Sequence, residues 1–325
     1  MFRTIAWLFL VLLSAGSLAQ ETPLRVNSFP ISTALPLFAG VSQGIFQRHG
    51  LKVELQLTPN SQKQREGLAA GAFEIAHSAA DNAVAMVEIG KHDVIIVTGG
   101  DSSMNELFAQ PDLRAIDDLR GRIVAVDAPN TAYALQAKKI LLLHGLKEGA
   151  DYTIKSVGST LSRYSAMRDD RQVAATMLNP PFSVDARAAG FKSLGRAVDL
   201  LGPYQAISAF VLRSWAKANA EALERYIAAY VEATRWSLDP ANKSAAAKLL
   251  IERFKLEPQV AERTLELLAD SAFGLARDAR FDMQGFRNVL ALRAEIEGSW
   301  GGKPPAPERY VDLSYYENAL KKISR

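Results

Sequence analysis

The sequence predicts an α/β protein made of two similar lobes and a helical carboxyl-terminal part. Between residues 24 and 82, three short apolar runs each lead into a small polar loop, and two helix-like segments separate the runs. The same plan begins again after Asn105, and the chain from Ser214 onward is predicted to be nearly all helical. In an open α/β sheet the loops after the strands gather outside the carboxyl ends, where such sheets bind ligands. The pattern therefore predicts a small-molecule crevice.

The composition is that of a globular protein with enough length for two lobes. The chain has 325 residues, of which 48% are hydrophobic and 22% charged, and its formal net charge is +3. Basic residues are scattered, and the densest pair, Lys138 and Lys139, lies beside an apolar run as on the solvated face of a helix. We therefore expect no nucleic-acid partner.

The first nineteen residues have the pattern of an export signal. Arg3 gives a positive start, an apolar run spans residues 5–13, and small residues at 17 and 19 suit a signal peptidase. We expect cleavage before Gln20. The alternative is an uncleaved anchor, but this run is far shorter than the roughly twenty residues that span a bilayer.

The sequence contains no cysteine. An exported protein without cysteine has no disulfide framework, so its hydrophobic core must hold it together. It also cannot be acylated at an amino-terminal cysteine, so we expect no lipoprotein. A soluble exported protein is retained where an outer membrane retains it, which favours the periplasm; free secretion is the alternative.

Strands and helices alternate through the first α/β unit. The stretch 51–57 alternates polar and apolar residues as a strand does, whereas 36–47 spaces its apolar residues by three and four as a helix does. Gly50 and Gly71 each end a helix. The predicted strands are 24–27, 51–57, 73–76 and 94–97. The predicted helices are 36–47, 61–70 and 81–89.

The second unit and the carboxyl-terminal part follow in the same way. An apolar run at 122–126 opens the unit, a long helical pattern closes at Gly145, and a strand at 206–212 is predicted to return to the first lobe. The other predicted strands are 151–157 and 173–178. The predicted helices are 132–144, 161–168, one that ends at 189, 214–237, 244–254, 258–269, 283–297 and 314–323.

Five short motifs resemble those of one family in the family's order. Residues 44–54 resemble the "GyF…GLdVel" element of the nitrate, sulfonate, taurine and thiamine-pyrimidine-precursor binding proteins of ABC transporters, and residues 67–76 resemble "aLaaGeiDia", with Glu74 where Asp is usual. Residues 118–126 resemble "DLkGKkvav" and residues 311–315 resemble "vDtSf". Residues 173–175 stand at "GqvDAa" without its Gly or Asp.

The resemblance implies a type 2 periplasmic binding protein fold. In that fold each of two lobes is a mixed sheet flanked by helices, and two crossover segments act as hinges, here expected near 102–105 and 204–208. The expected organisation is an export signal at 1–19, the first part of lobe 1 at 20–104, lobe 2 at 105–206, and the mostly helical second part of lobe 1 at 207–325.

The candidate ligand contacts are the residues of the loops that follow the strands. Polar side chains there can donate and accept hydrogen bonds, and helix amino termini offer unpaired N–H groups. Aromatic residues beside the loops could sandwich a planar ligand. The candidates are Phe29, Ser32, Asn60, Ser78, Ala79, Asp81, Asn130, Thr131, Tyr133, Asn179, Pro180 and Phe182.

Each candidate also has a purely structural interpretation. Ser61, Asn130 and Asn179 precede predicted helices and suit helix caps, and Asp81 competes with Ser78 for another cap position. The aromatic candidates suit ordinary core packing. His77 is a lone histidine near a loop, and we expect it to be hydrogen-bonded within the fold rather than catalytic.

The resemblance implies a soluble receptor that captures a small organic molecule between two lobes and delivers it to an ABC permease with its ATPase. We expect a monomer, no metal, no cofactor and no enzymatic activity. The ligand could be a sulfonate, a carboxylate or a nitrogen heterocycle; the scarcity of Arg and Lys in the loops favours a neutral or nitrogen-bearing aromatic compound. Two alternatives are a ligand sensor that docks on a membrane sensor kinase and an enzyme resembling pyrimidine synthases, whose cysteine-rich motif this chain lacks.

Overall fold

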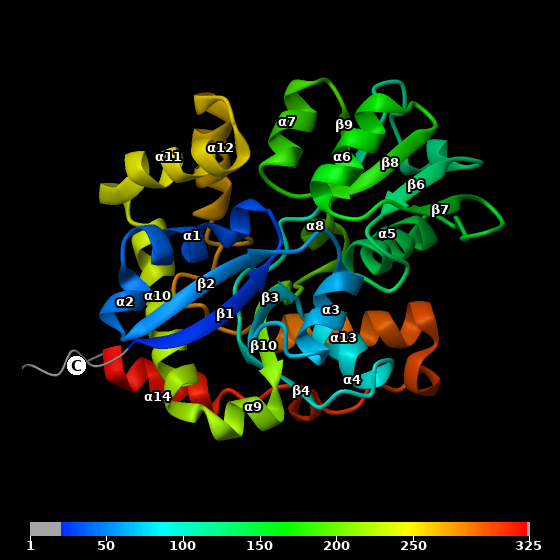
Figure 1. Ribbon diagram of the computed structural model, residues 1–325. Helices are drawn as coiled ribbons and strands as arrows, with labels where there is room; N and C mark the ends of the chain where they lie inside the picture. Colours follow the sequence, from blue (N-terminus) through cyan, green and yellow to red (C-terminus); the bar gives the residue numbers. More distant parts are fainter. Residues whose placement is uncertain (1–20, 324–325) are drawn as a thin grey trace, which may run out of the picture.

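The computed structural model describes residues 21–323, and the predicted export signal lies outside them. It contains two mixed five-stranded sheets flanked by helices, as predicted (Figure 1). The first sheet has the order β2-β1-β3-β10-β4. Its strands are β1 (Thr22–Ser28), β2 (Leu51–Leu57), β3 (Ile75–Ala79), β4 (Val94–Thr98) and β10 (Ile207–Leu212).

Parallel pairing in the first sheet brings the ends of three strands to one edge. β1 pairs in parallel with β2 from Thr22 opposite Leu51 to Ser28 opposite Leu57, and it pairs in parallel with β3. The returning strand β10 runs antiparallel to both β3 and β4. The loops after β1, β2 and β3 therefore leave the sheet on the same side.

The second sheet repeats this plan with the order β7-β6-β8-β5-β9. β6 pairs in parallel with β7 and β8, while β5 runs antiparallel to β8 and β9. Its strands are β5 (Glu106–Ala109), β6 (Ile123–Val126), β7 (Thr153–Ser156), β8 (Val173–Leu178) and β9 (Lys192–Arg196). β5 and β9 were not predicted, because they are short and pair with partners distant in the sequence.

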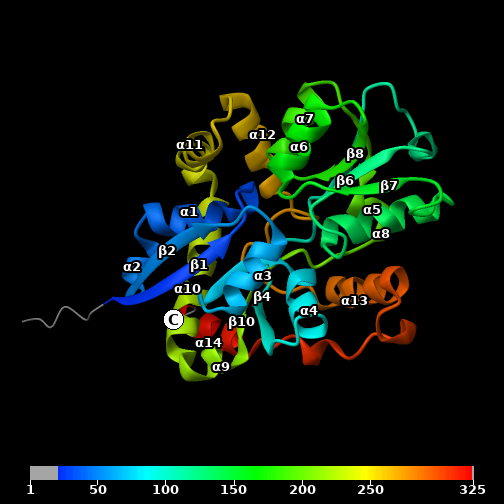
Figure 2. The same ribbon diagram turned by 45° about the vertical axis from the view of Figure 1, so that its right-hand side comes forward.

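Helices cover both faces of each sheet (Figures 1 and 2). The α-helices are α1 (Leu35–Ser42), α2 (Ile45–Arg48), α3 (Ser61–Ala69), α4 (Ala80–Glu88), α5 (Ala132–Leu143), α6 (Thr160–Asp169), α7 (Phe182–Ala188), α8 (Ala197–Leu201), α9 (Arg213–Ala218), α10 (Ala220–Ser237), α11 (Lys243–Phe254), α12 (Pro258–Leu268), α13 (Met283–Glu297) and α14 (Ser314–Ile323). The 3-10 helices are η1 (Ser32–Ala34), η2 (Ile116–Leu119), η3 (Pro240–Asn242), η4 (Ser299–Gly302) and η5 (Pro307–Arg309).

Two predicted helices are interrupted. The helix predicted at 36–47 is divided into α1 and α2 by Gly44, whose φ of 64° lies in the left-handed region that glycine adopts readily. The helix predicted at 214–237 is divided into α9 and α10 at Asn219, which has φ −128° and ψ 34°. In both cases the apolar spacing typical of a helix continues past the residue where the backbone changes direction. The sequence pattern therefore predicted one helix where there are two.

Strand side chains alternate between two cores. In β4, Ile95 packs in the cluster that contains residues of α1, α10 and α14, whereas Ile96 packs in the cluster that contains residues of α4 and α13. In β6, Val124 and Ala125 likewise enter separate clusters of the second lobe. Each sheet is therefore buried on both faces, as its near-continuous apolar strands predict.

The chain passes between the sheets twice. It leaves the first sheet between β4 and β5 and returns between α8 and β10. The two connections lie side by side, because the Asp101 carbonyl accepts a hydrogen bond from the Ala206 N–H at 3.1 Å. β5 begins at Glu106 and β10 at Ile207; the lobe boundaries after residues 104 and 206 and the role of these connections as hinges stay predictions.

His77 is a core residue, as expected. Its Nε2 lies 2.7 Å from the Tyr226 hydroxyl, and its ring lies 4.6 Å from the Tyr230 ring between centroids. Burial lowers the pKa of His77 to about 3. The imidazole is therefore neutral in the folded protein, which favours a structural role.

This buried histidine predicts a pH dependence of stability. Between pH 6.5 and 3 the unfolded chain binds a proton at His77 and the folded chain does not, so stability falls as the pH falls through this window. At pH 5 the contribution lost is about 2 kcal/mol, given an unfolded pKa of about 6.5. Urea denaturation of wild type and His77→Gln at pH 7.5 and pH 5 measures it.

The comparison of the two proteins cancels the other titrating groups. One of these is Asp101, whose pKa burial raises to about 6, so its contribution has the opposite sign and is lost as the pH rises through 6. The free-energy difference between wild type and His77→Gln should shift in favour of the variant at pH 5. An unchanged difference between the two pH values would show that His77 is not held neutral by the fold.

Candidate functional site

The site lies where the loops after the parallel strands of one sheet meet those of the other. In the first lobe the loops begin at Phe29 after β1 and Thr58 after β2, and β3 leads directly into α4 at Ala80. In the second lobe they begin at Asp127 after β6 and Asn179 after β8. Most of the polar side chains in both sets of loops are buried. Each lobe thus contributes one wall of the site.

Hydrogen bonds join the two walls directly. The Ser32 hydroxyl donates to the Pro180 carbonyl at 2.6 Å, and the Ser61 hydroxyl donates to Oδ2 of Asp127. Ser32 and Pro180 are both predicted site residues, and the structure brings them together. These contacts describe a closed arrangement of the lobes.

The helix that follows β2 shows how one predicted cap was misplaced by a residue. Asn60, not Ser61, is the N-cap of α3, and its Oδ1 accepts from the Lys63 N–H at 2.9 Å. Asn60 therefore serves the helix. Ser61, the first residue of α3, does not cap the helix, and its side chain contacts the opposite lobe.

Asn130 and Asn179 do not cap their helices. The N-cap of α5 is Thr131, whose hydroxyl donates to the Ala128 carbonyl at 2.9 Å, and the N-cap of α7 is Pro181. The capping interpretation was wrong for both asparagines. Their amides remain available for other contacts, and whether these include a ligand stays a prediction.

Asp81 is held by protein groups. Its carboxylate is fully buried in the first turn of α4, where the N-cap is Ala79. The Tyr204 hydroxyl donates to Oδ2, and the Arg293 Nε lies 3.4 Å from Oδ1. Burial raises the pKa of Asp81, while Arg293 and Tyr204 favour its charged form. The cap suggested for Asp81 was therefore wrong; the neighbouring Ser78 Oγ accepts from Asn82 at 2.5 Å.

Arg293 of α13 connects both lobes and was missed by the sequence analysis. Its Nη2 donates to the Asn130 carbonyl at 2.6 Å, and its Nη1 donates to Glu297 at 2.7 Å. A signal for it exists in the sequence, because Arg293 continues the apolar helical face of Phe286, Val289 and Leu290. A lone charge on such a face needs a buried partner.

Tyr133 forms part of the second lobe's wall. Its hydroxyl accepts from Nδ2 of Asn179 at 3.1 Å, and the Arg163 guanidinium lies 4.0 Å from its ring centroid. Arg163 is fully buried and donates to the carbonyls of Gly158 at 2.6 Å and Met177 at 3.1 Å. Packing and hydrogen bonds therefore fix the position of the Tyr133 ring.

The remaining candidate residues are buried or half-buried within their own lobes. Phe182 packs in the core of the second lobe, with its ring 6.2 Å from that of Tyr164. Phe29 is also buried, as are Ser78 and Thr131. Ala79, at the end of β3, is half-buried.

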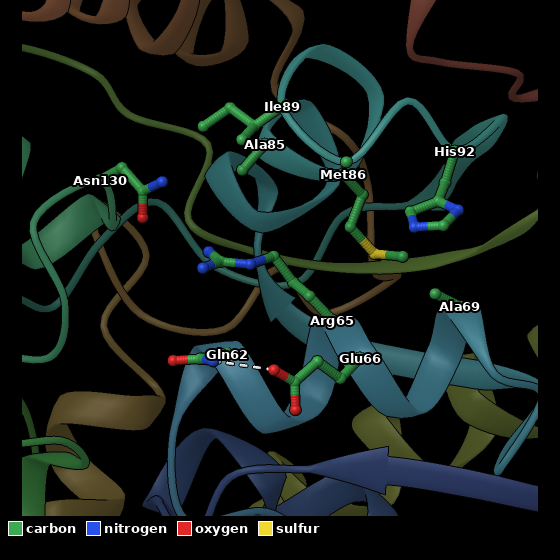
Figure 3. Close-up of a pocket in the computed structure, with 10 residues that line it drawn as sticks. Gln62, Arg65, Glu66, Ala69, Ala85, Met86, Ile89, His92 and Asn130 are labelled. Atoms are coloured by element: carbon green, nitrogen blue, oxygen red, sulfur yellow. Dashed lines mark hydrogen bonds between the residues drawn. The ribbon is translucent and has the colours of Figure 1, made fainter.

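A surface pocket of about 190 Å³ opens beside the site between α3 and α4 (Figure 3). Figure 3 shows the Arg65 side chain extending from α3 into it, with Asn130 of the second lobe at its edge. Arg65 donates to Oδ1 of Asn82 at 2.8 Å, and Ala85 and Met86 supply an apolar wall. The pocket is thus connected to the inner site through Asn82, which also donates to Ser61 at 3.2 Å.

Four buried side-chain oxygens of this region lack a hydrogen-bond partner among the described residues. They are Oε1 of Gln64, Oδ1 of Asp81, Oδ1 of Asp127 and Oδ1 of Asn179. Within residues 21–323, no group of three or more histidine, aspartate and glutamate side chains could hold a metal ion. None of the described helices is both long and apolar enough to cross a membrane.

Comparison with known proteins identifies the fold and the family. A binding protein from Brucella abortus is 25% identical over 317 residues, which cover 95% of this chain and 96% of that protein. A structure from Bordetella bronchiseptica RB50 superposes with a TM-score of 0.81 at 18% identity over 94% of this chain and 99% of the other. The periplasmic nitrate-binding protein NrtA of Synechocystis gives 0.76 at 14% identity over 94% and 89%.

The same fold also occurs in an enzyme, the desulfurization enzyme DSZB, with a TM-score of 0.62 at 14% identity over 93% of this chain and 99% of that one. These structural likenesses establish the periplasmic binding protein fold. The model of the NMT1-like family matches residues 18–251, which is more than half of the sequence. The chain therefore belongs to the NMT1-like family.

Proposed function

We propose that the protein is a periplasmic receptor that closes its two lobes on a small organic molecule and delivers it to the permease of an ABC transporter. The observation that carries this proposal is the set of hydrogen bonds between the two walls of loops, Ser32 to Pro180 and Ser61 to Asp127. Loops at the carboxyl edges of two sheets, joined by two crossovers, are suited to close around a ligand. The nitrate-binding protein NrtA, which has this fold, is a periplasmic binding protein, and this supports the same role here.

The site's chemistry favours binding over catalysis. Its side chains are mostly amides and hydroxyls, with the two carboxylates of Asp81 and Asp127, and such groups recognise a ligand by hydrogen bonds. The nearest histidine, His77, is bound to Tyr226 and kept neutral by burial, so it is poorly placed as a general base. Because an enzyme also has this fold, the fold alone does not distinguish a receptor from an enzyme. The residues of the candidate site support a receptor.

Arg293 contacts both lobes in the closed form. The residue is 1% exposed, and its guanidinium contacts the Asp81 carboxylate in one lobe and the Asn130 carbonyl in the other. A second ion pair, Lys139 of α5 with Glu295 of α13 at 2.5 Å, lies nearby on the surface. Figures 1 and 2 place α13 beside the lobe that holds α5 and α8. Helix α13 is therefore the element against which we expect the second lobe to move.

Closure predicts a change of size when bound solute is removed. Protein as purified should be compact, and the same protein dialysed in mild guanidinium chloride and returned to buffer should be more extended, because the lobes separate without ligand. Small-angle X-ray scattering compares the radii of gyration. Identical scattering curves before and after dialysis would contradict closure on a ligand.

Removal of Arg293 should destabilise the protein strongly. Arg293→Met leaves the Asp81 carboxylate buried without its cation, which costs about 3–5 kcal/mol of unfolding free energy. Adding Asp81→Asn should recover much of this loss, because the neutral amide needs no counter-ion. Urea denaturation measures each variant.

A matched control is Arg309→Met, which breaks the half-exposed pair of Arg309 with Glu88 at 2.9 Å. This loss should stay below about 1 kcal/mol. Equal losses for the two single variants, or a double variant no more stable than Arg293→Met, would show that the buried pair does not stabilise the fold.

The proposed location predicts a processed protein. Expressed with its first nineteen residues in a Gram-negative host, the protein should be released by osmotic shock, and its intact mass should correspond to a chain that begins at Gln20. Recovery of the unprocessed chain from the membrane or the cytoplasm would contradict export to the periplasm.

A further inference from the structure

Two of the unpartnered oxygens in the site can only accept hydrogen bonds. The Gln64 amide nitrogen donates to Oδ1 of Asn27 at 2.9 Å and to the His77 carbonyl at 3.2 Å. Because a backbone carbonyl only accepts, this contact fixes the orientation of the amide and leaves Oε1 as the atom without a partner. The Asp127 carboxylate likewise accepts only, and its Oδ1 has no partner.

Both residues are related to Ser61 of α3. Ser61 and Gln64 are three residues apart on α3, so their side chains are neighbours on one face of the helix. The Ser61 hydroxyl donates to Oδ2 of Asp127 from the opposite lobe. Gln64 therefore lies on the same face of α3 as the serine to which Asp127 of the other lobe is bonded.

Both oxygens are deeply buried. Gln64 is 0% exposed and Asp127 is 4% exposed, so bulk water does not reach them freely. A buried acceptor without a donor costs about 1–3 kcal/mol, more for a charged group. Asn179 adds a third group, and since the Tyr133 hydroxyl can donate or accept, this amide can present either its oxygen or its nitrogen.

The charge of Asp127 is already offset by the protein. Arg65 of the first lobe and Arg163 of the second both attract it electrostatically. Arg163 in turn directs its N–H groups at Gly158, Thr160 and Met177. The site therefore does not require a cationic ligand, and an anion would place its oxygens against acceptors that have no proton to share.

Resting on the receptor function proposed above, we propose that the site selects an uncharged ligand whose N–H groups donate to Asp127 and Gln64. The chemical class comprises primary amides, ureas and amino-substituted nitrogen heterocycles. The donors would satisfy one acceptor from each lobe, so the ligand would itself bridge the closed walls. Carboxylates and sulfonates would lack those donors.

Matched probes test the class. The whole mature chain, freed of solute by dialysis, is titrated by calorimetry with acetamide, benzamide, nicotinamide and cytosine. The donor-free counterparts are N,N-dimethylacetamide, N,N-dimethylbenzamide and N,N-dimethylnicotinamide, and the anions are acetate, benzoate, nicotinate and benzenesulfonate. At least one N–H compound should bind, at least about tenfold tighter than its dimethylated counterpart.

Variants assign the contact to the named residues. Asp127→Asn keeps an oxygen for Ser61 but removes the charge, and it should weaken the N–H compound about 10- to 100-fold. Gln64→Leu should weaken it as well. The control Asp112→Asn alters an exposed pair with Arg171 and should leave binding unchanged. Thermal melting of each variant confirms that it is folded.

The outcomes separate the two proposals. Preferential binding of an anion overturns the ligand class while the receptor function stands, and it would point to Arg65 as the recognising group. Equal binding of the amide and its dimethylated counterpart, or no effect of Asp127→Asn, also overturns the class. Binding of no compound at all counts against both the class and the receptor function.

Discussion

The closed form depends on the burial of a charged side chain between the lobes. Arg293 is almost fully buried, and a buried guanidinium is tolerated only when charges and hydrogen-bond acceptors surround it. Its acceptors come from three elements: Asp81 on α4, the Asn130 carbonyl before α5, and Glu297 on its own helix. The lobes must therefore approach in one relative position for these groups to be satisfied together. That constraint sets the positions of the loops that line the site.

Within that arrangement, the remaining polar groups divide into two kinds. Some are satisfied by the protein itself: Asn60 by the backbone of α3, and Arg163 by the carbonyls of Gly158 and Met177. Others are buried and still have unused hydrogen-bonding capacity, as Gln64 and Asp127 do. The first kind builds the receptor, and the second kind is where recognition of a ligand is expected. Buried acceptors in a folded protein normally have partners, so their distribution is informative.

Much of the fold could be predicted from local patterns. The strand, loop and helix alternation gave the two α/β units, and the parallel order of β1, β2 and β3 follows from the helices between them. Local patterns did not predict the pairing of strands that are far apart in the sequence. β5 is four residues long and contacts strands more than sixty residues away, so nothing nearby in the sequence marks it.

The location of the site was predicted more accurately than the contacts that its residues make. The loops that meet were identified, but Arg293 lies more than two hundred residues from Asp81, and only its position on an apolar helical face hints at burial. The caps were misplaced because Asn60 and Ser61, like Asn130 and Thr131, offer adjacent residues of similar capping ability. Which residue of each pair points toward the site depends on its contacts with the opposite lobe.

The most direct test of the central claim is native mass spectrometry of the protein isolated from its own cells. A receptor that closes around a small molecule should carry one organic molecule per chain, lost when the protein is unfolded and identifiable by its released mass. A homogeneous spectrum of the bare chain under gentle conditions, from cells in several growth media, would contradict the account.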